Sequence, residues 1–258
     1  MPREHDSLRK VLNDLKDLIL EEQEFFGETL ITQPPQQQKE TAMPPRKDAR
    51  VEEPLLFDKP PAGSAEPWGS ATSLDELNKL ICECLKCPLG HTRTKFVFGV
   101  GNPRATLLLV GEAPGADEDM QGEPFVGRAG QLLNKILEAI RFKREEVYIC
   151  NILKCRPPNN RNPEQDEVDQ CIPYLQKQIE LVKPKVILCL GLVAAGHLLG
   201  TRESLTKLRG RVLSYENIPV MVTYHPAALL RNPNWKRPAW EDVQAVRKLH
   251  DELVGTRG

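Results

Sequence analysis

Acidic side chains are concentrated in one short segment rich in glycine and proline, Gly111–Asp119 (GEAPGADED), which follows the apolar residues 105–110. A second segment with proline and glycine, Glu123–Gly127 (EPFVG), comes soon after it. Glycine lets a ligand approach the backbone closely, and proline fixes turns. A phosphate-binding loop would be neutral or basic. This segment, with Glu112 and Glu118, therefore suits activation of water or recognition of a base edge better than binding of a nucleotide phosphate.

Three further side chains could complete a site for a planar base. Asn151 and His225 each directly follow a predicted strand, and Phe125 lies in the second of the two segments. An amide presents a donor beside an acceptor, an aromatic ring can stack on a base, and a histidine can donate to a developing oxyanion. Alone, such an Asn is usually a turn residue and such a His a loop residue. Their shared position with Glu112 at the carboxyl ends of strands carries the prediction.

The chain has seven cysteines, an odd number that favours metal or cluster ligation over disulfides in an intracellular chain. Cys84 and Cys87 form a C-x2-C pair, and Cys155 and Cys171 form a C-x15-C pair. Four thiolates can hold a [4Fe–4S] cluster or a tetrahedral zinc ion, and the spacing leaves both open. The other three are interpreted as non-ligands: Cys82, Cys150 and Cys189.

Strands and helices alternate through the C-terminal two thirds of the chain. Ser73 and Glu76 form a capping box that begins a helix before the first strand. The alternation predicts an α/β fold with a mainly parallel sheet covered by helices on both faces. The predicted strands are 105–110, 146–150, 185–190 and 219–224, and the predicted helices that follow them are 130–142, 163–182, 191–199 and 238–253.

The composition divides the chain into three parts. Residues 1–30 contain an amphipathic helix, and residues 31–72 form a proline-rich linker that we expect to be disordered. Residues 73–258 form the domain that carries the motifs. The leucine stripe of the N-terminal helix could bind a protein partner or pack on the domain, and the sequence leaves both open.

Charge is distributed unevenly along the chain. Residues 1–75 contain 9 Lys and Arg against 15 Asp and Glu, whereas the whole chain has a formal net charge of −1. The remainder is therefore mildly basic, which fits a polyanionic partner as well as an ordinary solvated surface. The sequence has no apolar run near 18 residues and no signal peptide, so we expect a soluble cytoplasmic protein with no membrane partner.

Five motifs in order resemble those of family 4 uracil-DNA glycosylases, the iron–sulfur type of bacteria and archaea. They are GEAPGADED, EPFVG, NILKCRPP from Asn151, the helix-borne Cys171, and HPAALLRNP from His225. The resemblance covers about residues 73–258. It implies a central four-stranded, mainly parallel sheet flanked by helices. It also favours a [4Fe–4S] cluster over zinc, on Cys84, Cys87, Cys155 and Cys171.

The resemblance further implies a monofunctional glycosylase of base excision repair. Such an enzyme flips uracil out of single- or double-stranded DNA and hydrolyses its N-glycosidic bond, leaving an abasic site. Glu112 would position or activate the attacking water, and His225 would donate a hydrogen bond to uracil O2. Phe125 would stack on the base, and Asn151 would read its polar edge and disfavour cytosine. We expect the protein to be a monomer.

The resemblance also assigns roles to residues beside the base and in the DNA groove. Ala113 would contact the substrate, and Glu118 would stand near uracil C5, where it leaves little room for a thymine methyl. The stretch from Ala228 to Arg231 would wedge into the minor groove, with Leu229 or Leu230 filling the vacated stack.

Two other functional classes compete with the glycosylase. One is a non-catalytic sensor of uracil or abasic sites, against which Glu112, Asn151 and His225 argue. The other is an iron–sulfur electron carrier, for which the sequence offers no flavin or nicotinamide fingerprint. The loop at residues 229–240 (LLRNPNWKRPAW) contains no histidine that could trap DNA covalently, which argues for turnover.

Overall fold

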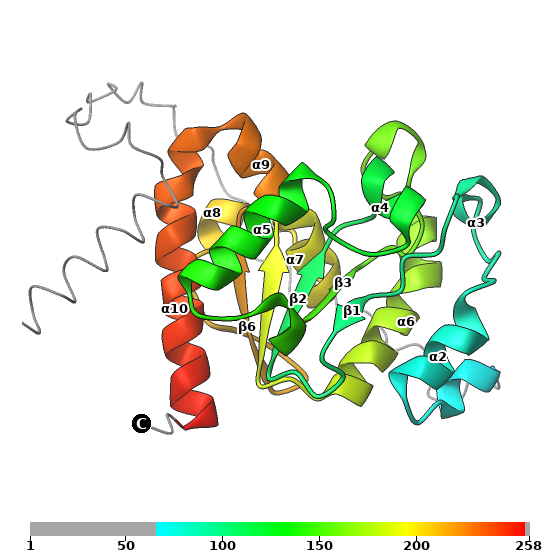
Figure 1. Ribbon diagram of the computed structural model, residues 1–258, viewed down its shortest axis with the longest axis horizontal. Coiled ribbons are helices and arrows are strands. Elements are labelled where there is room, and N and C mark those ends of the chain that lie inside the picture. Colours follow the sequence, from blue (N-terminus) through cyan, green and yellow to red (C-terminus); the bar gives the residue numbers. More distant parts are fainter. Residues whose placement is uncertain (1–65, 256–258) are drawn as a thin grey trace, which may run out of the picture. The chain divides into compact units, whose positions relative to one another are not determined.

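The computed structural model describes residues 66–255, and its central feature is a six-stranded sheet in the order β1-β3-β2-β4-β6-β5 (Figure 1). The predicted N-terminal helix and almost all of the predicted linker lie outside the described residues. The strands are β1 Val100–Gly101, β2 Leu107–Gly111, β3 Tyr148–Asn151, β4 Val186–Leu190, β5 Leu213–Tyr215 and β6 Ile218–Thr223.

Four parallel strands form the centre of the sheet. β3, β2, β4 and β6 pair in parallel, whereas β1 and β5 pair antiparallel at the two edges. The four central strands are those that the sequence predicts, and the mainly parallel α/β fold is confirmed. The two edge strands were not predicted. They have two and three residues, none of them fully buried, and are too short to produce a hydrophobic period.

Helices follow most of the strands, as the alternation predicts. The helix predicted from the capping box is present: Ser73 Oγ accepts from the backbone N–H of Glu76 (3.2 Å). The helices are α2 Leu74–Ile81, α3 Leu89–Thr92, α4 Ala116–Gln121, α5 Arg128–Ala139, α6 Gln165–Val182, α7 Leu192–Leu199, α8 Leu205–Leu208, α9 Pro226–Arg231 and α10 Lys236–Val254, with short 3-10 turns at Pro67–Ser70, Arg144–Glu146, Pro158–Asn160 and Pro233–Trp235.

The acidic segment, predicted as a loop, contains helix α4. Asp117, Glu118 and Asp119 occupy its first turn, where negative charge favours the positive end of the helix dipole. Gly122 ends the helix in the left-handed conformation (φ 85°). Both are helix signals, so the helix could have been predicted from the sequence.

Helices cover both faces of the sheet. Successive residues of a strand point to opposite faces, so each strand contributes side chains to both layers. On one face the buried residues of β2 and β4, such as Leu108 and Ile187, belong to one core with residues of α2, α6 and α7. On the other face Leu109 and Leu188 lie against α5, α9 and α10, which Figure 1 shows in green, orange and red. The site must therefore lie at the ends of the strands.

The carboxyl ends of β2 and β3 define where the site forms. β2 is the first of the parallel strands, and the chain then runs to β3 on one side of it and to β4 on the other. Open α/β sheets bind ligands at such a change of direction. Gly111 lies opposite Asn151 in the register of these strands, which places Asn151 beside the segment that begins with Glu112.

Candidate active site

A cavity of about 330 Å³ lies at these strand ends. It collects side chains from the ends of β2 and β3, from α4 and the segment after it, and from the start of α9. Of the residues predicted from the sequence, it is lined by Glu112, Ala113, Glu118, Phe125, Asn151, His225 and Arg231.

Asn151 has a buried side-chain oxygen without a hydrogen-bond partner. It is 2% exposed, and its Oδ1 has no hydrogen-bond partner among the described residues. A buried polar atom without a partner is rare and costs about 1–3 kcal/mol. Gly111 lies so close that a Cβ there would collide with Oδ1 of Asn151. Asn151 thus lines the cavity with an amide that is tightly packed and keeps unused hydrogen-bonding capacity.

Phe125 closes one side of the cavity in an unusual backbone conformation. It is 6% exposed, and its φ of +53° is uncommon for a bulky residue. Arg144 Nη2 donates to the carbonyl of Pro124 (2.6 Å), and the carbonyl of Phe125 packs against Gly130, where any side chain would clash. The ring thus has a fixed position, as a stacking platform requires.

His225 also lines the cavity, and its ring contacts that of Phe125, with ring centroids 5.5 Å apart. It is the N-cap of α9: its Nδ1 accepts from the backbone N–H of Ala227 (3.2 Å), so the ring proton lies on Nε2. Burial, helped by the charge of Arg231, lowers the pKa of His225 to about 4. The imidazole is therefore a neutral N–H donor at physiological pH.

The two predicted acidic residues have different environments. Burial raises the pKa of the Glu112 carboxyl above its usual value, which suits a proton acceptor. Glu118 instead accepts three backbone hydrogen bonds, from Gly115 (3.1 Å), Val126 (2.9 Å) and Gly127 (3.0 Å). The bonds from Val126 and Gly127 fasten α4 to the segment that follows Phe125, and the bond from Gly115 lies at the N-cap of α4. Glu118 therefore shapes the cavity wall. This structural role comes in addition to its predicted position near the base.

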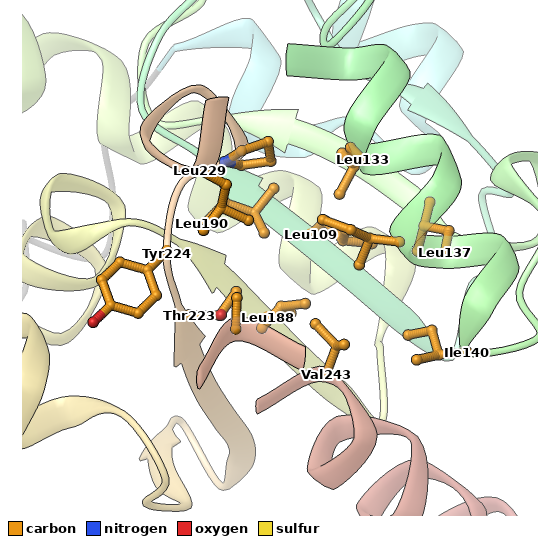
Figure 2. A pocket seen from close by; sticks show the side chains of 13 residues that line it. Leu109, Leu133, Leu137, Ile140, Leu188, Leu190, Thr223, Tyr224, Leu229 and Val243 are labelled. Carbon is orange, nitrogen blue, oxygen red and sulfur yellow. The ribbon is translucent and has the colours of Figure 1, made fainter. Parts of the chain in front are cut away.

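Leu229, one of the two leucines predicted to fill the vacated stack, is a core residue. It is 1% exposed and lies with Leu109, Leu133 and Leu190 in the apolar space between the sheet and α5 (Figure 2). Leu230 is 40% exposed. Of the two leucines, the exposed Leu230 is therefore the better placed to reach DNA.

Sequence reasoning gave no role to three residues that line the cavity beside Pro157, namely Asn160, Arg161 and Asn162. Arg161 makes two hydrogen bonds to the buried carboxylate of Glu167 (2.6 and 2.9 Å). Only a short run of prolines and asparagines marks these residues in the sequence, which is the usual signal of a turn.

The four predicted cluster ligands share one part of the core. Cys155 and Cys171 are buried, and Cys84 and Cys87 pack against the same cluster of apolar residues. The pKa of Cys155 is raised to about 11, mainly by burial and to a smaller extent by the neighbouring Cys87 and Cys84, against a lowering effect of Arg93. Burial likewise raises the pKa of Cys171 to about 12. Such thiols become thiolates when a metal replaces the proton.

The surroundings of these thiols fit an iron–sulfur cluster. Three donors point at sulfur: Arg93 Nη1 at Cys155 (3.5 Å), the Lys154 N–H at Cys171 (3.3 Å) and the Tyr174 hydroxyl at Cys84 (3.3 Å). Hydrogen bonds to sulfur are typical of cluster sites. Within residues 66–255 the structure contains no group of three or more side chains placed to hold a metal ion.

Comparison with known proteins identifies the family. The model of the uracil DNA glycosylase superfamily matches residues 98–244. The chain is 44% identical over 185 residues to the type-4 uracil-DNA glycosylase of Archaeoglobus fulgidus, covering 69% of this chain and 93% of that protein. The chain belongs to the type-4 uracil-DNA glycosylases. The matched residues contain the cavity side chains, but not Cys84 and Cys87.

Other relatives place the chain within the superfamily. The type-4 uracil-DNA glycosylase of Thermotoga maritima is 42% identical over 183 residues, 68% of this chain and 95% of that protein. The type-5 uracil-DNA glycosylase of Pyrobaculum aerophilum is 31% identical over 164 residues, 57% of this chain and 71% of that protein.

None of the helices within residues 66–255 has the length and apolar character that a membrane span requires.

Proposed function

We propose that this protein is a monofunctional uracil-DNA glycosylase of base excision repair. The observation that carries the proposal is the unpartnered Oδ1 of Asn151, which is buried in a cavity together with Glu112, Phe125 and His225. A flipped uracil offers what this cavity lacks: a flat face for the phenyl ring and a polar edge for the amide. The protein would act in the cytoplasm, as a monomer, on single- or double-stranded DNA.

Recognition begins with extrusion of the nucleotide, at a cost of about a few kcal/mol. The uracil ring stacks on Phe125, and the amide of Asn151 bonds O4 and N3–H of its edge. Cytosine has an amino group and an unprotonated N3 at these positions, so donor would meet donor and acceptor would meet acceptor. Because Asn151 is buried, a mismatched partner leaves its polar atoms without hydrogen bonds, which is costly.

Bond cleavage then follows from the neighbouring groups. The bond between C1′ and N1 breaks, its electron pair leaves with uracil, and the sugar becomes cationic. His225 Nε2–H donates to O2, where negative charge develops, and a donor so placed contributes about 2.7–4 kcal/mol. Because His225 is neutral, it stabilises the uracil anion by hydrogen bonding and does not protonate it.

Water completes the reaction. Glu112 lies at the end of β2, partly buried, where its carboxylate orients a water molecule towards C1′ and accepts the water proton. The water oxygen forms the new bond to C1′, and an abasic site results. No lysine lines the cavity in the described part of the chain. Lys154, three positions after Asn151, is completely buried. No covalent attachment to the sugar follows, so the strand stays intact.

DNA would be held by the exposed end of α9 and by the loops around the cavity. Leu230 is exposed and would enter the stack that uracil leaves. Arg231, exposed at the rim, would contact the backbone or the groove. The domain would comprise residues 73–258, and the helix predicted within residues 1–30, beyond the linker at 31–72, would bind a protein partner or pack on the domain.

The cofactor would be a [4Fe–4S] cluster on Cys84, Cys87, Cys155 and Cys171. When bound, it would supply a covalent cross-link between the turn after α2 and the β3–α6 segment, with no redox chemistry needed for uracil release. Arg93 would support the turn, since its guanidinium also donates to the carbonyls of Cys84 (2.6 Å) and Cys82 (2.9 Å). Cys171→Ala should lose iron and visible absorbance and lower the melting temperature, whereas Cys82→Ala should retain all three.

The test is incubation of the full chain with a duplex that contains one uracil, followed by alkali. Cleavage at the uracil position that requires alkali is the expected result. A shifted band on a native gel without alkali-labile sites would instead indicate a sensor. Neither binding nor cleavage by an iron-loaded protein would leave the electron carrier as the better explanation.

A further inference from the structure

The buried side chain of Lys154 has no role in the mechanism above, although it lies next to the site. It is 0% exposed, and its Nζ donates to the backbone carbonyl of Asn151 (2.8 Å) and to Oε1 of Gln178 (2.6 Å). Both acceptors belong to buried residues. A lysine that is completely buried is rare and calls for a specific explanation.

Gln178 on α6 fixes the other end of this contact. Its Nε2 donates to the carbonyl of Phe98 (2.9 Å) and to the hydroxyl of Tyr148 (3.1 Å). With its nitrogen engaged by two acceptors, its oxygen must face Lys154. The Nζ of Lys154 is therefore held by α6 and by the beginning of β3, independently of Asn151.

The backbone of Lys154 touches the cysteine centre on its other side. Its N–H donates to Sγ of Cys171 (3.3 Å), and its carbonyl accepts from the N–H of Val97 (2.9 Å). One residue thus contacts both a predicted cluster ligand and the base-reading residue Asn151.

The contact with Lys154 reaches Asn151 at the end of the paired part of β3. The N–H groups of Ile152 and Leu153 bond to the carbonyls of Gly111 and Glu112 (2.9 and 3.0 Å), which joins the two strand ends that carry the site. The carbonyl of Asn151 receives the Nζ of Lys154. The bond from Lys154 Nζ and the bond from the Ile152 N–H thus hold the peptide plane from which the Asn151 side chain starts.

We infer that Lys154 is a positioning residue that holds the base-reading amide of Asn151 in place and connects it to Cys171. The inference rests on the proposed function. A displacement of about 1 Å at a reacting group costs about 10²-fold in rate. Lys154 lies behind the cavity wall, so it acts only through Asn151 and touches neither the base nor the sugar.

The test compares Lys154→Met with the unsubstituted chain in two binding measurements. Free uracil is the probe of the base pocket and is measured as an inhibitor of uracil release. A duplex with an abasic site is the probe of the DNA surface. We expect the inhibition constant of uracil to rise about 10-fold, while the affinity for the abasic duplex stays within about 2-fold. Lys248→Met, at an exposed position of α10, is the matched control and should change neither.

Gln178→Met provides a second variant that keeps Lys154 but removes one anchor of its Nζ. It should weaken uracil inhibition in the same direction by about 3-fold, a fraction of the effect of full misplacement. Iron content should equal that of the unsubstituted chain in both variants, because the backbone N–H at position 154 still donates to Cys171. Should Lys154→Met fail to fold, the Gln178→Met result decides.

Two results would overturn the inference. One is unchanged inhibition by uracil in the variants that fold. The other is an equal loss of affinity for uracil and for the abasic duplex, which would mean that Lys154 only supports the domain as a whole. If the unsubstituted chain releases no uracil, the proposed function itself is refuted, and that outcome is seen before any variant is compared.

Discussion

Replacement of His225 by asparagine separates two functions that one imidazole combines. Nδ1 caps α9 through the N–H of Ala227, and Nε2 carries the proton that would be donated to uracil O2. Asparagine is among the best N-cap residues, so its amide oxygen can keep the cap. Its side chain is shorter than that of histidine and cannot place a donor where Nε2 lies.

The size of the effect follows from these two contacts. Loss of one donor to a developing anion costs about 2.7–4 kcal/mol, or about 10²–10³ in rate. Loss of an N-cap costs about 0.5–2 kcal/mol of stability. His225→Asn should therefore lose rate but little stability, whereas His225→Ala should lose both.

Two assays at neutral pH measure these quantities. Single-turnover release of uracil from a duplex gives the rate of bond cleavage, and urea denaturation gives the free energy of unfolding. The reasoning fails if His225→Asn releases uracil at a near-normal rate. It also fails if the two variants are equally destabilised, because the cap would then not be what distinguishes them.

Three other predictions concern neighbouring residues. Asn151→Asp should weaken the discrimination against cytosine, measured as the ratio of release rates for uracil and cytosine; an unchanged ratio would exclude edge reading. The acid limb of the pH–rate profile should follow the raised pKa of Glu112 and show no break near pH 6.5 from His225. The folded-state pKa of His225 is depressed, so its contribution to the free energy of unfolding should be complete above about pH 6.5 and be lost as the pH falls towards 4. Leu229→Ala should cost about 2–5 kcal/mol of unfolding free energy, whereas Leu230→Ala should leave stability within about 0.5 kcal/mol and slow release from duplex more than from single strands; the reverse pattern would contradict the assignment of the two leucines.

The central strands and the positions of the site residues could be predicted because they depend on local pattern. Parallel strands buried on both faces are continuous apolar runs, and the residue that follows such a run lies at the edge where ligands bind. This reasoning placed Glu112, Asn151 and His225 around one cavity, as the structure has them. The edge strands β1 and β5 could not be predicted, because they form by pairing with β3 and β6 and are too short to show a pattern in the sequence.

Other features depend on contacts between residues far apart in the chain. Leu229 and Leu230 are adjacent and identical in type, and only the packing of α9 on α5 decides which one is buried. The hydrogen bond from Arg144 to the Phe125 segment, and the contact of Lys154 with Gln178, join residues about 20 positions or more apart. Periodicity and spacing carry no signal for such pairs.

The most direct test of the central claim is the ratio of single-turnover rates on two duplexes that differ only in carrying uracil or cytosine opposite guanine. A buried amide built to match one polar edge should reject the other by about 10⁴-fold or more. Rapid release of uracil with no detectable release of cytosine is the predicted result. Release of both bases at rates within about 10-fold would contradict recognition through Asn151.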